Sequence, residues 1–157
     1  MSMRLKLTLL ISFLFITAIG NSLFFFQLKS YEEDKLVWVN HTHEVIYQSE
    51  RFLSSLKDTE TGQRGYLLTE TLSYLQPYYI GIKESNDLFN KLYKKTLDNP
   101  KQTKRLDKIK ILMHKKFAEL KETIVLTQNG NLTEAILLVN EDIGKEIMDN
   151  MRVLILE

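Results

Sequence analysis

Polar side chains that could bind a ligand interrupt an apolar helical stripe near the middle of the chain. Residues seven apart return to nearly the same face of a helix, and Leu53, Glu60 and Leu67 stand in one such column. The neighbouring columns carry Thr59 and Gln63 at the same level. Burying an unpaired carboxylate or amide costs several kcal/mol, so these groups need partners, water or a ligand.

Two interpretations of this polar group stay open. In the first, it is a ligand-binding or conformational-switch site, and its candidate residues are Thr59, Glu60, Gln63, Arg64 and Tyr66. In the second, it is a buried polar network that other helices satisfy and that fixes their register. Glu60 and Arg64 are also spaced to pair along one helix, which would stabilise it by a few tenths of a kcal/mol.

Two glycines, Gly62 and Gly65, lie inside the same helical segment, with Thr69 continuing their ridge. An interior glycine costs a helix about 1 kcal/mol relative to alanine, so two of them need a reason. The close approach of a second helix, as in a homodimer, is one reason, and a local bend is the other. If Gly62, Gly65 and Thr69 are dimer contacts, Gly62→Leu should disrupt association and leave the monomer folded.

The sequence shows no catalytic constellation, and we expect no cofactor. There is no cysteine, and His41 and His43 stand two residues apart, which directs them to different sides of a helix. His114 is the remaining histidine, so we expect no metal site. The net charge of +1 also gives the chain no strong positive potential that would attract nucleic acid. We therefore expect that this stretch is not an enzyme.

An apolar segment near the N-terminus predicts a membrane anchor. Residues 7–28 contain no charged residue, and roughly 20 apolar residues are enough for a spanning helix. A cleaved signal peptide is the alternative, but the apolar run continues past its small residues. The basic residues of 1–6 should stay in the cytoplasm, which places residues 30–157 on the extracytoplasmic side.

The remaining chain predicts an all-α fold. Apolar residues recur at steps of three and four, and the four expected helices span about residues 30–69, 77–97, 100–129 and 132–157. No segment alternates with the period of a strand. Four amphipathic helices with short loops predict an up-down-up-down four-helix bundle, whose first helix continues from the transmembrane helix.

Local signals mark the helix ends. Asn99 is an expected N-cap, with Pro100 at the first helical position. Gly130 suits the left-handed position after a helix. Asn131, followed three residues later by Glu134, predicts a capping box. The last helical pattern continues to the end of the given sequence, and we expect a second transmembrane span and an output domain after residue 157.

The sequence from Asp58 to Thr69, Asp-Thr-Glu-Thr-Gly-Gln-Arg-Gly-Tyr-Leu-Leu-Thr, resembles the signature of the third class of CHASE extracellular sensor domains. The resemblance spans roughly residues 35–155 and includes Tyr74-Leu-Gln-Pro-Tyr78. The family usually has Ala in place of Thr59, and a Gly-Asp or Gly-Glu pair where Glu70-Thr71 stands. The turn at that point is therefore expected to differ.

The resemblance implies a helical sensor module on a prokaryotic membrane receptor. Such modules occur mainly on histidine kinases, and also on diguanylate cyclases and chemoreceptors. It implies no particular ligand, so a small-molecule or a protein signal stays open. A homodimer is expected, and a relative shift of the first and last helices could carry the signal. The alternative is a membrane-anchored bundle without a signalling role, serving as an adaptor or assembly protein.

Overall fold

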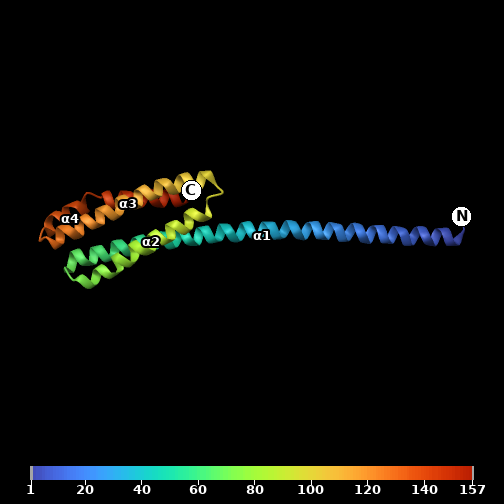
Figure 1. Ribbon diagram of the computed structural model, residues 1–157, viewed down its shortest axis with the longest axis horizontal. Helices are drawn as coiled ribbons and strands as arrows, with labels where there is room; N and C mark the ends of the chain where they lie inside the picture. The colour runs from blue at the N-terminus through green and yellow to red at the C-terminus, as the bar shows by residue number, and fades with distance from the viewer. Residues whose placement is uncertain (1, 157) are drawn as a thin grey trace. The chain divides into compact units, whose positions relative to one another are not determined.

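The computed structural model describes residues 2–156, apart from the side chains of residues 30, 33 and 34. Their helices are α1 (Met3–Thr69), the 3₁₀ helix η1 (Leu72–Tyr74), α2 (Leu75–Lys95), α3 (Pro100–Gln128), α4 (Leu132–Asn140) and α5 (Ile143–Leu156), shown in Figure 1. No strand occurs among these residues. The all-α prediction is confirmed.

The chain divides into two compact units, residues 1–44 and residues 45–157. The first unit holds the apolar part of α1. Its segment Met3–Lys29 has a mean hydropathy of 2.1 and is long and apolar enough to cross a membrane. No residue in the most apolar part of this segment is buried against protein. These side chains are therefore free to be covered by lipid.

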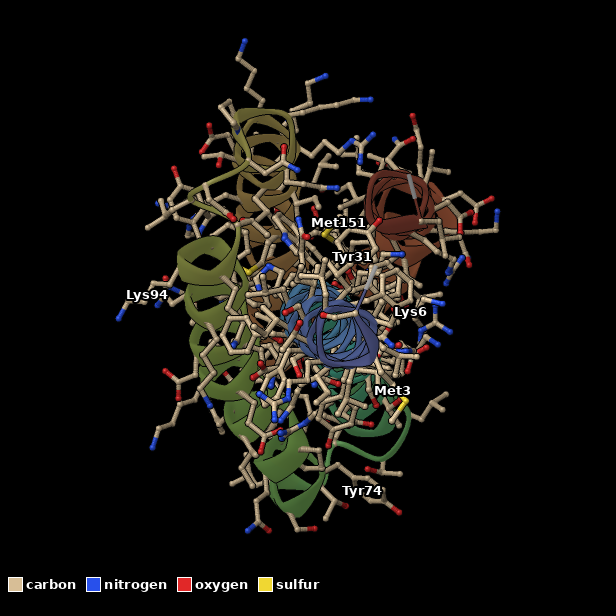
Figure 2. All side chains as sticks on the ribbon, turned by 90° about the vertical axis from the view of Figure 1, so that its right-hand side faces the viewer. Met3, Lys6, Tyr31, Tyr74, Lys94 and Met151 are labelled. Atoms are coloured by element: carbon tan, nitrogen blue, oxygen red, sulfur yellow. The ribbon has the colours of Figure 1, made fainter. Side chains whose placement is uncertain are left out.

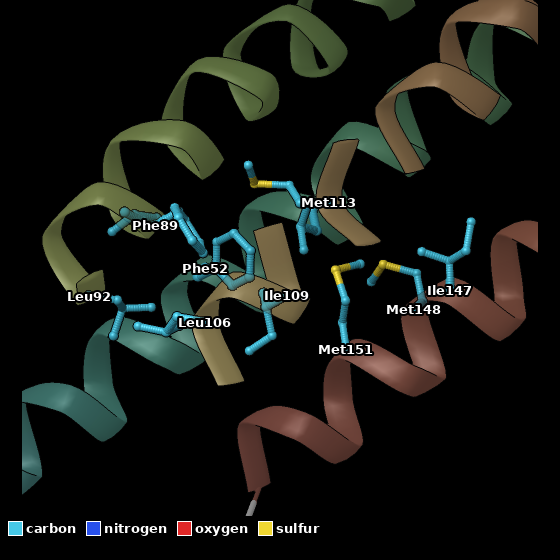
Figure 3. Packing of buried hydrophobic residues seen from close by; sticks show 11 residues of the cluster. Phe52, Phe89, Leu92, Leu106, Ile109, Met113, Ile147, Met148 and Met151 are labelled. Carbon is cyan, nitrogen blue, oxygen red and sulfur yellow. The ribbon is translucent and has the colours of Figure 1, made fainter. Parts of the chain in front are cut away.

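The second unit is a helical bundle with a continuous apolar core. Phe52 of α1 and Phe89 of α2 lie with their ring centroids 6.1 Å apart. Figure 3 shows side chains of α3 and α5 closing the same cluster. Its other buried members are Leu56, Leu88, Leu92, Leu106, Ile109, Met113, Ile147, Met148 and Met151. Because α1, α2, α3 and α5 all contribute to one core, the expected four-helix bundle is confirmed.

A second apolar cluster lies at the end of the unit that carries η1 and α4. Its buried members are Tyr66, Leu67, Leu75, Tyr78, Leu120, Ile124 and Ala135. Beside and between these clusters α1 also makes polar contacts: the Ser55 and Ser85 hydroxyls lie 2.8 Å apart within the level of the first cluster, and Gln63 Nε2 donates to Thr123 Oγ1 at 2.7 Å between the clusters. Where the apolar stripe is interrupted, polar side chains of α1 therefore have hydrogen-bond partners on other helices.

Glycines allow α1 and α2 to approach closely. A Cβ at Gly62 would lie 2.6 Å from the backbone nitrogen of Tyr78, and one at Gly65 would lie 2.6 Å from the Tyr74 ring. Gly81 of α2 faces the backbone of α1 in the same way, because a Cβ there would lie 2.8 Å from the carbonyl oxygen of Ser55. Of the two reasons considered for Gly62 and Gly65, the close approach of a second segment therefore applies. That segment, η1 and the start of α2, belongs to the same chain. The participation of Gly62, Gly65 and Thr69 in a dimer stays a prediction.

The helix expected over 132–157 is broken, which corrects that prediction. α4 ends at Asn140 and α5 begins at Ile143, and between them Asp142 has a φ of +58°. The apolar pattern hid the break because Ile136 and Ile143 continue it, although both are exposed. Ala135 is instead the residue of α4 that is buried.

The residues predicted to mark helix ends are confirmed at Asn99 and Gly130 but not at Asn131. The Asn99 side chain accepts from the backbone N–H groups of Lys101 and Gln102, and Gly130 has a φ of +81°. Asn131 precedes α4 but makes no side-chain capping hydrogen bond, so the capping box is wrong. Its ψ of 49° departs from the extended conformation in which a cap oxygen reaches the first turn.

Candidate functional site

A cleft of about 500 Å³ opens in the second unit, between α1, α3 and α5. Its floor is formed by Lys116 of α3, whose side chain is only 2% exposed. Lysine is almost never buried to this degree unless it is paired. The surroundings of its ammonium group therefore define the chemistry of the cleft.

Two carboxylates hold the buried ammonium. Lys116 Nζ lies 2.9 Å from Glu119 Oε2, one turn further along α3, and 3.7 Å from Glu60 Oε1 of α1. The side chains of Glu119 and Glu60 are 12% and 18% exposed. Because each ion is largely withdrawn from water, separating them would leave uncompensated charge, which costs several kcal/mol.

Glu60 also connects the floor of the cleft to its rim. Its Oε1 lies 2.6 Å from Arg64 Nη2, one turn further along α1. The Arg64 side chain is 59% exposed. The Glu60 carboxylate is thus shared between the buried ammonium of Lys116 and the exposed guanidinium of Arg64, and it can move toward either cation.

Gly144 brings α5 directly over this ion pair. A Cβ at Gly144 would lie 2.6 Å from Lys116 Nζ and 2.9 Å from Glu119 Oε2. The residue stands two positions after the backbone break at Asp142. The start of α5 and the ammonium of α3 therefore occupy adjoining space, and neither can shift without affecting the other.

The rim of the cleft on α5 carries a second ion-pair group. Asp149 Oδ2 accepts from Lys145 Nζ at 3.2 Å, and its Oδ1 accepts from Arg152 Nη1 at 2.6 Å. These hydrogen bonds, that of Lys145 first, hold the pKa of the Asp149 carboxyl below its ordinary value of 3.8. The side chains are 44–70% exposed, so solvent screens their attraction.

Comparison with known proteins gives a family for this architecture. The model of the CHASE3 domain matches residues 35–157. The chain belongs to the CHASE3 domain family. The match covers the whole bundle, so the resemblance carried by Asp58–Thr69 is confirmed and the cleft lies within the CHASE3 domain.

A solved structure has the same fold as this CHASE3 domain. The crystal structure of the sensor domain of a Rhodopseudomonas palustris histidine kinase superposes with a TM-score of 0.67 and 18% sequence identity, over 72% of this chain and 88% of that one. Comparison with the sequences of curated proteins gives no match. Family and fold both support an extracytoplasmic sensing domain of a signalling receptor.

The structure divides the candidate ligand or switch residues of the CHASE3 domain between three places. Glu60, Gln63 and Arg64 line the cleft, although Gln63 is 1% exposed and bonded to α3. Thr59 lies on the side of α2, where its hydroxyl donates to the Ser55 carbonyl oxygen. Tyr66 packs in the second apolar cluster. Part of the expected group therefore borders one cleft.

Sequence reasoning missed Lys116, Glu119 and Gly144. A signal was present for the lysine, because Met113, Lys116 and Leu120 follow one another at steps of three and four and share the buried face of α3. Nothing in the sequence pairs Glu60 with a residue 56 positions later, since only the packing of α1 on α3 brings them together. Among the side chains that the structure describes, no three from His, Asp or Glu cluster as metal ligands.

Proposed function

We propose that residues 30–157 form the extracytoplasmic input domain of a membrane-anchored receptor whose output domain is a histidine kinase. Membership of the CHASE3 family over residues 35–157 is the observation that carries the proposal. The apolar segment Met3–Lys29 supports the anchor, and a histidine kinase sensor domain of the same fold supports the choice of output.

The cleft suggests how such a domain would work. Its lining residues come mainly from α1, α3 and α5, so a change in its contents bears on the relative position of α1 and α5. A ligand shifts a conformational equilibrium only by the difference in its affinity for the two states. Because Gly144 lies against Lys116, filling or rearranging the floor would favour a different position of α5. Packed helices tend to switch between discrete arrangements.

The proposed output can be tested without knowing the signal. Gly144→Ala places a methyl group 2.6 Å from Lys116 Nζ, so it should displace either the ammonium or α5. In the full-length receptor in lipid nanodiscs we expect basal autophosphorylation to change by about fivefold or more. Lys94→Ala is the control, since Lys94 lies on the exposed face of α2 and points away from the bundle in Figure 2. Equal phosphorylation of a folded Gly144→Ala protein and the wild type would contradict the proposal.

The proposed orientation has its own test. Since the chain has no cysteine, single cysteines at Ser2 and at the exposed Ser54 can be labelled without background. With a membrane-impermeant maleimide added to intact cells, Ser54→Cys should react, and Ser2→Cys should react only after lysis. Labelling of Ser2→Cys in intact cells would contradict an extracytoplasmic bundle.

We also propose that the receptor works as a homodimer, because a rearrangement within the bundle must reach an output shared between chains. Gly62 is occupied by its own chain, so this proposal does not depend on it, and Thr69 remains exposed. Sedimentation of the full chain in detergent at several concentrations should show a dimer. A monomer at every concentration would contradict it.

A further inference from the structure

The charge of the cleft changes sign between its floor and its rim. The floor holds one cation, Lys116, and two carboxylates, Glu60 and Glu119, each at most 18% exposed. The rim holds four cations and two carboxylates, all in exposed or partly exposed side chains: Lys57, Arg64, Lys145, Arg152, Asp142 and Asp149. The floor is thus net negative and the rim net positive. A complementary ligand carries a positive group inward and a negative group outward.

The floor has an acceptor that the protein does not satisfy well. Glu119 Oε2 is buried and accepts no hydrogen bond of normal angle within residues 2–156, although Lys116 Nζ lies 2.9 Å from it. A buried acceptor left in this condition costs free energy. An ammonium group brings three N–H donors, so a ligand's ammonium could donate to Glu60, whose side chain is 18% exposed, and could reach Glu119 Oε2 only where Lys116 Nζ gives way.

The rim has donors that can turn toward a ligand. Arg64 is 59% exposed and is held by a single contact to Glu60, and Arg152 is 44% exposed. A guanidinium binds a carboxylate through two parallel hydrogen bonds. Lys57, on the α1 side of the cleft, adds another exposed cation. These groups suit a carboxylate at the mouth of the cleft.

The size of the cleft suits a small molecule. Its volume of about 500 Å³ lies within the range of roughly 300–1,000 Å³ typical of small-ligand sites. Val139 and Met148 add apolar surface to the lining, which gives a ligand side chain something to pack against.

We propose that the cleft binds a free α-amino acid, with its ammonium group toward Glu119 and Glu60 and its carboxylate toward Arg64 and Arg152. This inference rests on the proposed sensing function and names the ligand class of that site. An α-amino acid is the smallest common molecule that carries both charges a few ångströms apart. A plain carboxylic acid would bring no positive charge to the net-negative floor, and a plain amine would bring no negative charge to the net-positive rim.

The test is calorimetric titration of the full chain in lipid nanodiscs with each of the common α-amino acids. We expect saturable binding of at least one. For that amino acid, the matched acid without the amino group and the matched amine without the carboxylate should each bind at least about tenfold more weakly, since each lacks a charge-assisted contact. Glu119→Gln and Arg64→Gln should each weaken binding by about tenfold or more. Lys94→Ala, outside the cleft, should not.

Three outcomes would overturn the inference: no binding of any amino acid, equal binding of the matched acid or amine, or binding that persists in both Glu119→Gln and Arg64→Gln. Circular dichroism melts establish that each variant is folded, and Arg64→Gln keeps the test decisive if Glu119→Gln unfolds. The titration measures binding on the chain itself, whereas autophosphorylation of the Gly144→Ala receptor reports the proposed receptor function. A lack of amino-acid binding is therefore distinguishable from a failure of the receptor function.

Discussion

The ammonium of Lys116 lies 2.9 Å from the carboxylate of Glu119 on the same helix, and both are withdrawn from water beneath Gly144 of α5. The pair therefore links the α3 surface to the beginning of α5. Glu60 extends the link to α1 at 3.7 Å. Three helices thus meet at one set of charges, and rearranging these charges affects all three.

Removing the buried cation should destabilise the bundle. Lys116→Met keeps most of the buried stem but leaves Glu119 and Glu60 without their common partner, so we expect a loss of about 2 kcal/mol or more in the free energy of unfolding. Urea unfolding measures it. The double variant Lys116→Met, Glu119→Leu should recover part of the loss, because it removes a stranded carboxylate. A single variant as stable as the wild type would contradict the paired arrangement.

Adding a methyl group at Gly62 should destabilise the folded chain itself. The new Cβ would lie 2.6 Å from the backbone nitrogen of Tyr78 and 3.0 Å from the carbonyl oxygen of Tyr74, so α2 must move. Overpacking of this kind costs about 1–3 kcal/mol. Gly62→Ala should lower the melting temperature, whereas Ser54→Ala at an exposed position of α1 should not. An unchanged melt with weakened dimerisation would instead support a dimer contact.

The two asparagines that precede helices should differ in importance. Asn99 accepts two backbone hydrogen bonds at the start of α3, so Asn99→Ala should cost about 1 kcal/mol of stability. Asn131 makes no such bond before α4, and Asn131→Ala should cost only a few tenths of a kcal/mol at most. Thermal melts of the two variants side by side make the comparison. Equal losses would show that Asn131 caps α4 after all.

Asp149 should contribute to stability in a pH-dependent way. Its folded pKa is below the unfolded value of 3.8, chiefly because Lys145 donates to it and Arg152 adds to the effect. A depressed pKa contributes stability that is fully present above pH 3.8 and is lost as pH falls through the folded pKa. The melting temperatures of wild type and Asp149→Asn should therefore differ near neutral pH and converge in acid. A difference that stays constant would rule out this origin.

The sequence was informative where a local rule governs the structure. Asn99 and Gly130 mark helix ends because capping and left-handed turns depend on neighbours along the chain. The apolar periodicity predicted a helix over residues 100–129, and α3 spans Pro100–Gln128. These features require no knowledge of which helix packs against which.

The sequence was less informative where packing decides. Gly62 and Gly65 were ambiguous until the approach of η1 and α2 to α1 was known. The break at Asp142 was hidden because Ile136 and Ile143 keep the helical spacing across it. The cleft depends on Glu60 and Lys116, which are far apart in the chain and meet only in the folded bundle.

The most direct test of the account asks whether the signal passes through the relation of α1 to α5. Lys57→Cys and Arg152→Cys, on opposite walls of the cleft, would be bridged with a bismaleimide in the full-length receptor, with and without Gly144→Ala. We predict that autophosphorylation differs between the two proteins before bridging and is equal afterwards. The Lys57→Cys single variant, treated with the same reagent, controls for modification without bridging. A difference that persists under confirmed bridging would contradict the account.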